Sequence, residues 1–293
     1  MTATDMRPTL ATLRIVERPR RDILGEGPVW CPQDQALYWV DIIGQKVNRL
    51  ALDDGAISDW DCPEMIGWLL PRTQGGFIAG LKSGFHTLAL DPFALEPIHA
   101  PEPDRPGNRM NDACVDARGR IWAGTMQMDG QGAGGHLYRL ETDLSVKRVD
   151  EGYHIANGPT ISGDGTTLYH TDSLLGRVYR FAIGPDGELG PRETFLQFPE
   201  EWGSPDGMCC DSAGGIWIAH WGAGCISRFL PDGTRERFIE LPASQITKCV
   251  FAGNNLDRMF VTSAADGVDE THAGCLFEVD TGFTGLPPHS FAG

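Results

Sequence analysis

The sequence predicts an all-β fold, a six-bladed β-propeller, and three observations indicate it. A short apolar strand centred on an aromatic residue occurs six times, an alternating strand follows each copy, and the copies lie 39 to 48 residues apart. A repeat of about 40–50 residues that carries about four short strands is typical of a propeller blade. We therefore expect residues 1–293 to form one domain of six blades.

The first motif places an aromatic anchor in each apolar strand. The anchors are Tyr38, Phe77, Trp122, Tyr169, Trp217 and Phe260, with spacings of 39, 45, 47, 48 and 43 residues. After each anchor apolar and polar residues alternate, as over residues 176–181, and this period of two is the pattern of a β-strand. Asp-Gly pairs such as Asp164-Gly165 lie between the strands, where hairpin turns favour them.

The N-terminal segment, residues 1–20, contains the strand-like stretch Thr-Leu-Arg-Ile-Val at residues 12–16. Propellers avoid open sheet edges, because an unpaired edge strand can pair with another chain. We therefore expect this segment to close the last blade.

Composition and charge exclude several classes of partner. Hydrophobic residues make up 41% of the chain, the formal net charge is −16 and the pI is about 4.8. A strongly acidic surface repels nucleic-acid phosphates and anionic lipids, so neither nucleic acid nor a membrane is an expected partner. Residues 1–16 lack the apolar run of a signal peptide, and the eight cysteines form no Cys-x-x-Cys pair. We expect a cytoplasmic monomer or small homo-oligomer.

Four polar residues recur at nearly the same position of the repeat. Three of them adjoin a glycine or proline, and the fourth lies in an Asn-Asp pair. Glu26, Asn111, Asn157 and Asp206 precede the next anchor by 12, 11, 12 and 11 residues. Asn-Gly and Asp-Gly pairs are common in ordinary turns, so the shared offset carries the inference rather than any single residue. Equivalent positions on the inner strands of different blades would bring these side chains together at one mouth of the central channel.

Carboxylate and amide oxygens are hard ligands that suit divalent cations. Two carboxylates and one amide leave such a cation with positive charge and open coordination positions, so it could polarise a carbonyl group and bind water. The pattern therefore predicts a hydrolytic metal site in the channel.

Several stretches resemble one protein family, the SMP-30/gluconolactonase family, which includes regucalcin and bacterial sugar lactonases. The matching stretches are residues 25–28, 111–113, 123–126, 155–158, 169–173 and 205–208. The resemblance extends over almost the whole chain and is strongest to bacterial xylono- and arabinonolactonases. It implies that the metal ligands are Glu26, Asn157 and Asp206, holding one Ca²⁺, Zn²⁺, Mn²⁺ or Fe²⁺.

The resemblance also implies substrate contacts for Arg109 and Asn111. Asp129 follows Gly124-Thr125-Met126 at the place where some relatives have a glutamate that contacts the substrate. The expected activity is the hydrolysis of a sugar-acid lactone, pentono- or hexono-, to the free sugar acid in carbohydrate catabolism. Asp206 is the candidate catalytic residue, as a general base in addition to being a ligand.

Three alternatives remain open from the sequence. The chain could be a calcium-binding regulatory protein of the regucalcin type, a metal-dependent aryl esterase or phosphotriesterase on the same scaffold, or a propeller that only binds other proteins. A serine hydrolase is not expected, because the sequence contains no Gly-x-Ser-x-Gly motif.

Overall fold

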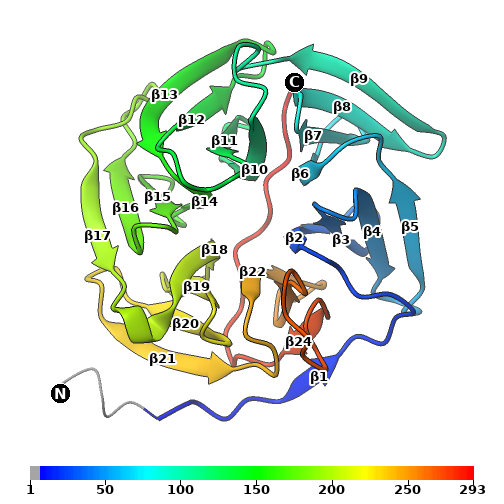
Figure 1. Cartoon of the computed structure of the whole chain (residues 1–293), viewed down its shortest axis with the longest axis vertical. Helices are drawn as coiled ribbons and strands as arrows, with labels where there is room; N and C mark the ends of the chain where they lie inside the picture. Colours follow the sequence, from blue (N-terminus) through cyan, green and yellow to red (C-terminus); the bar gives the residue numbers. More distant parts are fainter. Residues whose placement is uncertain (1–6) are drawn as a thin grey trace.

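Six four-stranded antiparallel sheets stand around a central axis (Figure 1). The computed structural model describes residues 7–293. The first strand of each sheet contacts the first strands of its two neighbours, which closes the ring. The predicted all-β, six-bladed propeller is confirmed.

The six sheets follow one another along the chain. The first contains β2 (Gly25–Cys31), β3 (Ala36–Asp41), β4 (Lys46–Ala51) and β5 (Ile57–Asp61). The second contains β6 (Ile66–Pro71), β7 (Phe77–Leu81), β8 (Gly84–Leu90) and β9 (Phe93–His99). The third contains β10 (Asn108–Val115), β11 (Ile121–Gln127), β12 (Gly135–Leu140) and β13 (Val146–Tyr153).

The remaining sheets repeat this order. The fourth contains β14 (Ala156–Ile161), β15 (Thr167–Asp172), β16 (Arg177–Ala182) and β17 (Glu193–Gln197). A short 3-10 helix, η2 (Glu200–Trp202), leads to the fifth, which contains β18 (Ser204–Cys210), β19 (Ile216–Trp221), β20 (Cys225–Phe229) and β21 (Arg235–Glu240). The sixth contains β22 (Ile246–Ala252), β23 (Arg258–Ser263), β24 (Phe277–Val279) and β1 (Leu13–Ile15).

The aromatic anchors all lie in the second strand of their sheets, where they are buried. Tyr38 of β3 packs edge-on against Phe77 of β7, the anchor of the next sheet. Aromatic pairs of this kind fill the space between neighbouring sheets. The repeat spacing seen in the sequence is therefore the spacing of the second strands of the six sheets.

The outer strand of the sixth sheet comes from the other end of the chain. In β1, Leu13 pairs with Val279 and Ile15 pairs with Phe277 of β24. This pairing joins the N-terminal segment to the last blade; residues 1–6 of that segment lie outside the described residues. Within residues 7–293, no helix has the length and hydropathy needed to cross a membrane.

Each innermost strand contains a β-bulge near its start. In β2, Glu26 pairs with Val40 and the ladder resumes at Val29 opposite Tyr38, so two residues face one. The same interruption occurs in β10, β14 and β18, and in β6 and β22 a single extra residue interrupts the ladder. A bulge bends the strand and redirects its side chains, and here all six bulges surround the channel.

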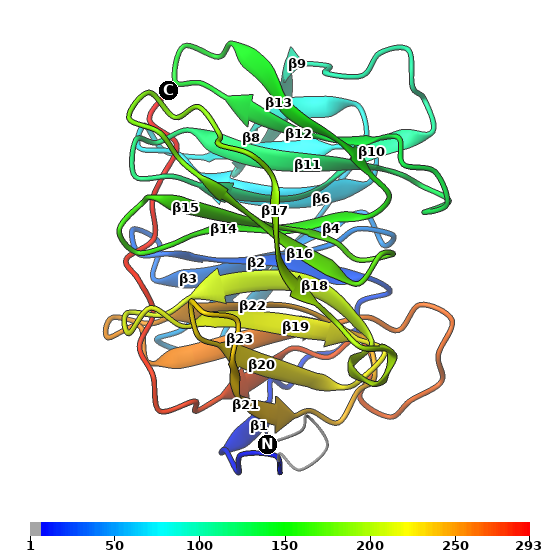
Figure 2. The same cartoon turned by 90° about the vertical axis from the view of Figure 1, so that its left-hand side faces the viewer.

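The C-terminal segment after β24 crosses the ring and covers one end of the channel (Figures 1 and 2). The amide of Ser212 donates to the carbonyl of Thr284 over 2.9 Å, and that of Ala292 donates to Gly119 over 3.0 Å. Phe291 is fully buried. These hydrogen bonds join the C-terminal segment to the third and fifth sheets, so it acts as a strap over this face.

In alternate sheets an aspartate, an arginine and a tryptophan form a buried cluster. Each indole N–H donates to the aspartate, over 2.8 to 3.0 Å, and the arginine pairs with the same carboxylate. The clusters are Asp22, Arg18 and Trp39 in the first sheet, Asp116, Arg120 and Trp122 in the third, and Asp211, Arg228 and Trp217 in the fifth. They satisfy indole groups that would otherwise be buried without partners.

We predict that Asp211→Asn destabilises the fold, mostly above pH 4. Burial would raise the pKa of Asp211, but hydrogen bonds from Arg228, the amide of Gly215 and the indole of Trp217 together outweigh it and hold the pKa below the ordinary 3.8. As the pH falls, the unfolded chain therefore takes up this proton first, and the stability present at higher pH is lost below about pH 4. Removing the charge at neutral pH should cost about 3 kcal/mol, because Arg228 loses a buried partner.

Thermal unfolding of the wild type and of Asp211→Asn between pH 2.5 and 7 measures this loss of stability. Asp211→Asn should lower the melting temperature at pH 7 and flatten its decline in acid, whereas the exposed control Asp104→Asn should leave both unchanged. An equal acid decline in wild type and Asp211→Asn would contradict the assignment.

Candidate functional site

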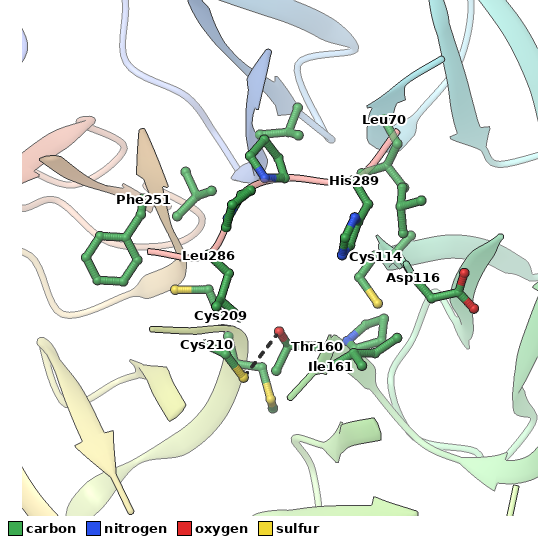
Figure 3. Close-up of a pocket in the computed structure, with 18 of the residues that line it drawn as sticks. Leu70, Cys114, Asp116, Thr160, Ile161, Cys209, Cys210, Phe251, Leu286 and His289 are labelled. Atoms are coloured by element: carbon green, nitrogen blue, oxygen red, sulfur yellow. Dashed lines mark hydrogen bonds between the residues drawn. The ribbon is translucent and has the colours of Figure 1, made fainter. Parts of the chain in front are cut away.

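Two pockets occupy the two ends of the central channel. The site pocket has a volume of about 480 Å³, and its polar lining includes Glu26, Arg109, Asn111, Asn157 and Asp206. The tail pocket, about 370 Å³, lies at the end crossed by the C-terminal segment. Figure 3 shows the tail pocket, with Leu286 and His289 of that segment and with Cys114 and Cys210 among its lining residues. The chemistry predicted from the sequence belongs to the site pocket.

The bulges place the candidate residues in this pocket. Asn111 and Asp206 lie within the bulges of β10 and β18, and Glu26 and Asn157 come directly before those of β2 and β14. These four residues line the site pocket, whereas residues that follow the bulges, such as Val29 and Thr160, line the tail pocket. The four side chains thus reach one pocket from four blades.

Asp206 is almost completely buried, and its Oδ1 atom has no hydrogen-bond partner. Burial, and after it the negative charges of Glu26 and Asp112, raises the pKa of Asp206 well above its usual range. A buried carboxylate without a partner is costly, and a bound cation would relieve that cost.

Glu26 is a second buried carboxylate whose pKa is raised. Burial, together with the charge of Asp112, raises the pKa of Glu26 to about 8. Its Oε2 accepts a 2.9 Å hydrogen bond from the amide of Gly27, the first residue of the bulge. This bond fixes the carboxylate at the wall of the pocket that also holds Asp206.

Asn157 is held at both ends of its amide group. Its Nδ2 donates to Ser173 Oγ over 2.9 Å, and its Oδ1 accepts from Asn111 Nδ2 over 2.6 Å. Asn111 Nδ2 also donates to the carbonyl of Ala156 over 2.7 Å. An amide oxygen has two lone pairs, so Asn157 Oδ1 can still bind a cation.

Arg109 supplies a positive charge to the pocket. It donates through Nη1 to Asn111 Oδ1 over 2.5 Å and to the carbonyl of Met110 over 3.0 Å. Burial lowers the pKa of Arg109 to about 10, so the guanidinium stays charged at neutral pH. Arg109 and Asn111 therefore act as one hydrogen-bonding unit.

Asp129 lies at the exposed rim of the pocket, in the turn after β11. Its Oδ1 accepts from the amide of Gln131 over 3.0 Å, and Oδ2 accepts from Gln127 Nε2 over 3.2 Å. Much of the remaining wall is apolar: Leu24, Ile42, Ile43, Met65, Met126, Met128, Ile155, Leu174 and Trp221.

Two charged residues that the sequence search missed lie between the pockets. Lys248 of β22 forms an ion pair with Asp112 of β10. Asp112 also accepts from the amides of Ala113, over 2.7 Å, and Gly158, over 2.8 Å. Lys248 precedes the anchor Phe260 by 12 residues, the offset between Glu26 and Tyr38, so its repeat position could have revealed it.

The donor set fits a divalent cation. Glu26 and Asp206 offer carboxylate oxygens and Asn157 an amide oxygen, and Asp206, whose Oδ1 has no hydrogen-bond partner, lines the same pocket. Among residues 7–293, no three His, Cys, Asp or Glu side chains gather as a metal cluster, so the amide would be an essential third ligand. Such an all-oxygen set suits hard cations better than soft ones.

Comparisons with known proteins agree with this architecture. The chain is 37% identical to pentonolactonase XacC of Haloferax volcanii, over 95% of this chain and 97% of the relative. It is 35% identical to regucalcin of Danio rerio, over 92% of this chain and 95% of the relative. The solved structure of regucalcin, a calcium-binding protein from Agrobacterium tumefaciens, superposes with a TM-score of 0.91 at 27% identity, covering 96% of this chain and 97% of that one.

The family suggested by the sequence motifs is confirmed by a match over most of the chain. Residues 24–265 match the model described as the SMP-30/gluconolactonase/LRE-like region, a span that includes all six inner strands and every candidate site residue. The chain therefore belongs to the SMP-30/gluconolactonase/LRE-like family.

Proposed function

We propose that the protein hydrolyses a sugar-acid lactone, a pentono- or hexonolactone, to the free sugar acid, with one divalent cation held by Glu26, Asn157 and Asp206. The observation that carries the proposal is the buried, unpartnered Oδ1 of Asp206 in the pocket that also contains Glu26. The lactonase class is supported by relatives such as the pentonolactonase, which aligns over almost the whole chain. We place the reaction in the cytoplasm, in carbohydrate catabolism.

The reaction is the opening of a cyclic ester by water. A divalent cation bound here would be Ca²⁺, Zn²⁺, Mn²⁺ or Fe²⁺, and it would supply positive charge for the oxygen anion that develops on the lactone carbonyl. Asp206 accepts a proton from the attacking water as the water oxygen bonds to the carbonyl carbon. The bond from that carbon to the ring oxygen then breaks, and the ring oxygen takes up a proton to become a hydroxyl group.

Arg109, Asn111 and Asp129 orient the sugar in this scheme. Arg109 donates to Asn111 Oδ1 and keeps further N–H groups, and Asn111 Oδ1 keeps a second lone pair, so the two residues can bind sugar hydroxyls in a fixed direction. Asp129 at the rim can accept a hydrogen bond from a hydroxyl at the far end of the substrate. Such positioning lowers the entropic part of the barrier.

We predict that Asp206→Asn abolishes most turnover without unfolding the protein. The amide cannot accept the proton and is a weaker cation ligand, so kcat should fall by about 1,000-fold. Lactone hydrolysis followed by pH-stat titration measures this loss, and circular dichroism reports the fold. Asp266→Asn is the matched control, because Asp266 also lines the pocket but is exposed; its kcat should stay near the wild-type value. Near-normal turnover by Asp206→Asn would remove Asp206 from the mechanism.

We also predict that cation removal destabilises the wild type and leaves the stability of Asp206→Asn almost unchanged. Without a cation, the buried charges of Glu26 and Asp206 repel each other, so Asp206→Asn should be more stable than wild type in chelator, by about 1 kcal/mol. Added cation at about 100 times its Kd should stabilise wild type by about 2.7 kcal/mol and leave the variant almost unchanged. Thermal unfolding with and without Ca²⁺ or Mn²⁺ checks this, and equal cation-induced shifts in both proteins would contradict the ligand assignment.

A substrate screen separates the proposed reaction from the alternatives. Chelated protein, with each metal added back, is assayed with pentono- and hexonolactones, aryl esters and phosphotriesters. The proposal expects metal-dependent opening of lactones, with the esters and phosphotriesters at least about tenfold slower in kcat/KM. Calcium binding without turnover of any substrate would favour a regulatory protein instead.

A further inference from the structure

A buried ion pair spans the channel below the candidate cation site. Lys248 comes from the sixth sheet and Asp112 from the third, and in a ring of six sheets these two stand opposite each other. Both side chains are less than a tenth exposed. Lys248 also lines the tail pocket, so the pair lies between that pocket and the residues of the site pocket.

Asp112 connects this pair to the site residues through the backbone. Its carboxylate accepts from the amide of Ala113, in its own strand, and from the amide of Gly158, in the neighbouring one. Asp112 directly follows Asn111, and Gly158 directly follows Asn157. The same carboxylate therefore fixes the two bulges that present the amide side chains of the pocket.

The pair also balances the charges at the centre of the molecule. Glu26, Asp112 and Asp206 lie close enough for their charges to interact. Lys248 neutralises Asp112, which leaves the two carboxylates of the cation site to balance a divalent cation.

We propose that Asp112 and Lys248 are positioning residues that set the charge of the cation site and hence its affinity for the divalent cation. The proposal rests on the proposed function insofar as it requires that cation. It assigns no step of the reaction to either residue. It predicts that the two charges act on affinity in opposite directions and cancel when both are removed.

The test is a double-mutant cycle with Lys248→Met, Asp112→Asn and the double variant, all close in shape to the wild type. Binding of Mn²⁺ alone is followed by the electron paramagnetic resonance signal of the free ion, with Ca²⁺ titration calorimetry in parallel. Circular dichroism and thermal unfolding of each metal-free variant report the fold.

Lys248→Met should bind Mn²⁺ about tenfold more tightly, because the charge of Asp112 is no longer balanced. Asp112→Asn should bind it about tenfold more weakly, because the charge of Lys248 then opposes the cation. The double variant should return to within about threefold of wild type.

A purely structural pair would behave differently. Both single variants would then bind the cation more weakly, and the double variant would be no better; this result, or single variants equal to wild type, would overturn the proposal. Absence of Mn²⁺ and Ca²⁺ binding by the wild type would instead contradict the cation site and, with it, the proposed function.

Discussion

The bulge near the start of each inner strand is the constraint on which the functional centre depends. A regular strand would continue its ladder, whereas the bulge leaves residues unpaired and directs polar side chains toward the axis. Their backbone N–H groups then need new partners, because an unsatisfied buried donor is costly. Site carboxylates provide them: Glu26 accepts from Gly27, and Asp112 accepts from Ala113 and Gly158. The bulges and the buried acids therefore stabilise each other.

Close contact between neighbouring bulges explains the glycines that follow the ligands. A Cβ atom on Gly158, whose φ is +44°, would come within 2.9 Å of the carbonyl oxygen of Asp206. One on Gly207 would come within 2.5 Å of the Lys248 side chain. Only glycine allows the inner strands to approach this closely, and the approach lets oxygens from separate blades share one pocket. Asn-Gly and Asp-Gly are thus packing requirements here as well as turn residues.

The periodicity of the sequence was sufficient to predict the fold and part of the site. The physical reason differs between the fold and the site. The anchors, from Tyr38 to Phe260, repeat because each is a buried aromatic residue in the second strand of its sheet, so their spacing alone indicates the blades. Asp206 and its equivalents share an offset from these anchors, which the same period reveals. Asp112 and Lys248 were missed because the search admitted only acids and amides at one position, while the pair depends on a contact across the ring. The strap over the tail pocket has no repeat at all, so no periodic pattern could predict it.

The charge of the site pocket affects how the substrate enters and how the product leaves. The Asp112–Lys248 pair spans the channel and the C-terminal segment crosses its far end, so we expect substrate and product to use the same mouth. With Glu26 and Asp206 balanced by the cation, the pocket keeps the carboxylates of Asp129 and Asp266 against the cationic lining residue Arg109. A neutral lactone is not repelled by this excess, whereas the sugar acid formed from it carries a negative charge. Screening limits such effects to about 8 Å at physiological ionic strength, so the rim carboxylate of Asp129 would favour release of the product while barely affecting substrate in solution.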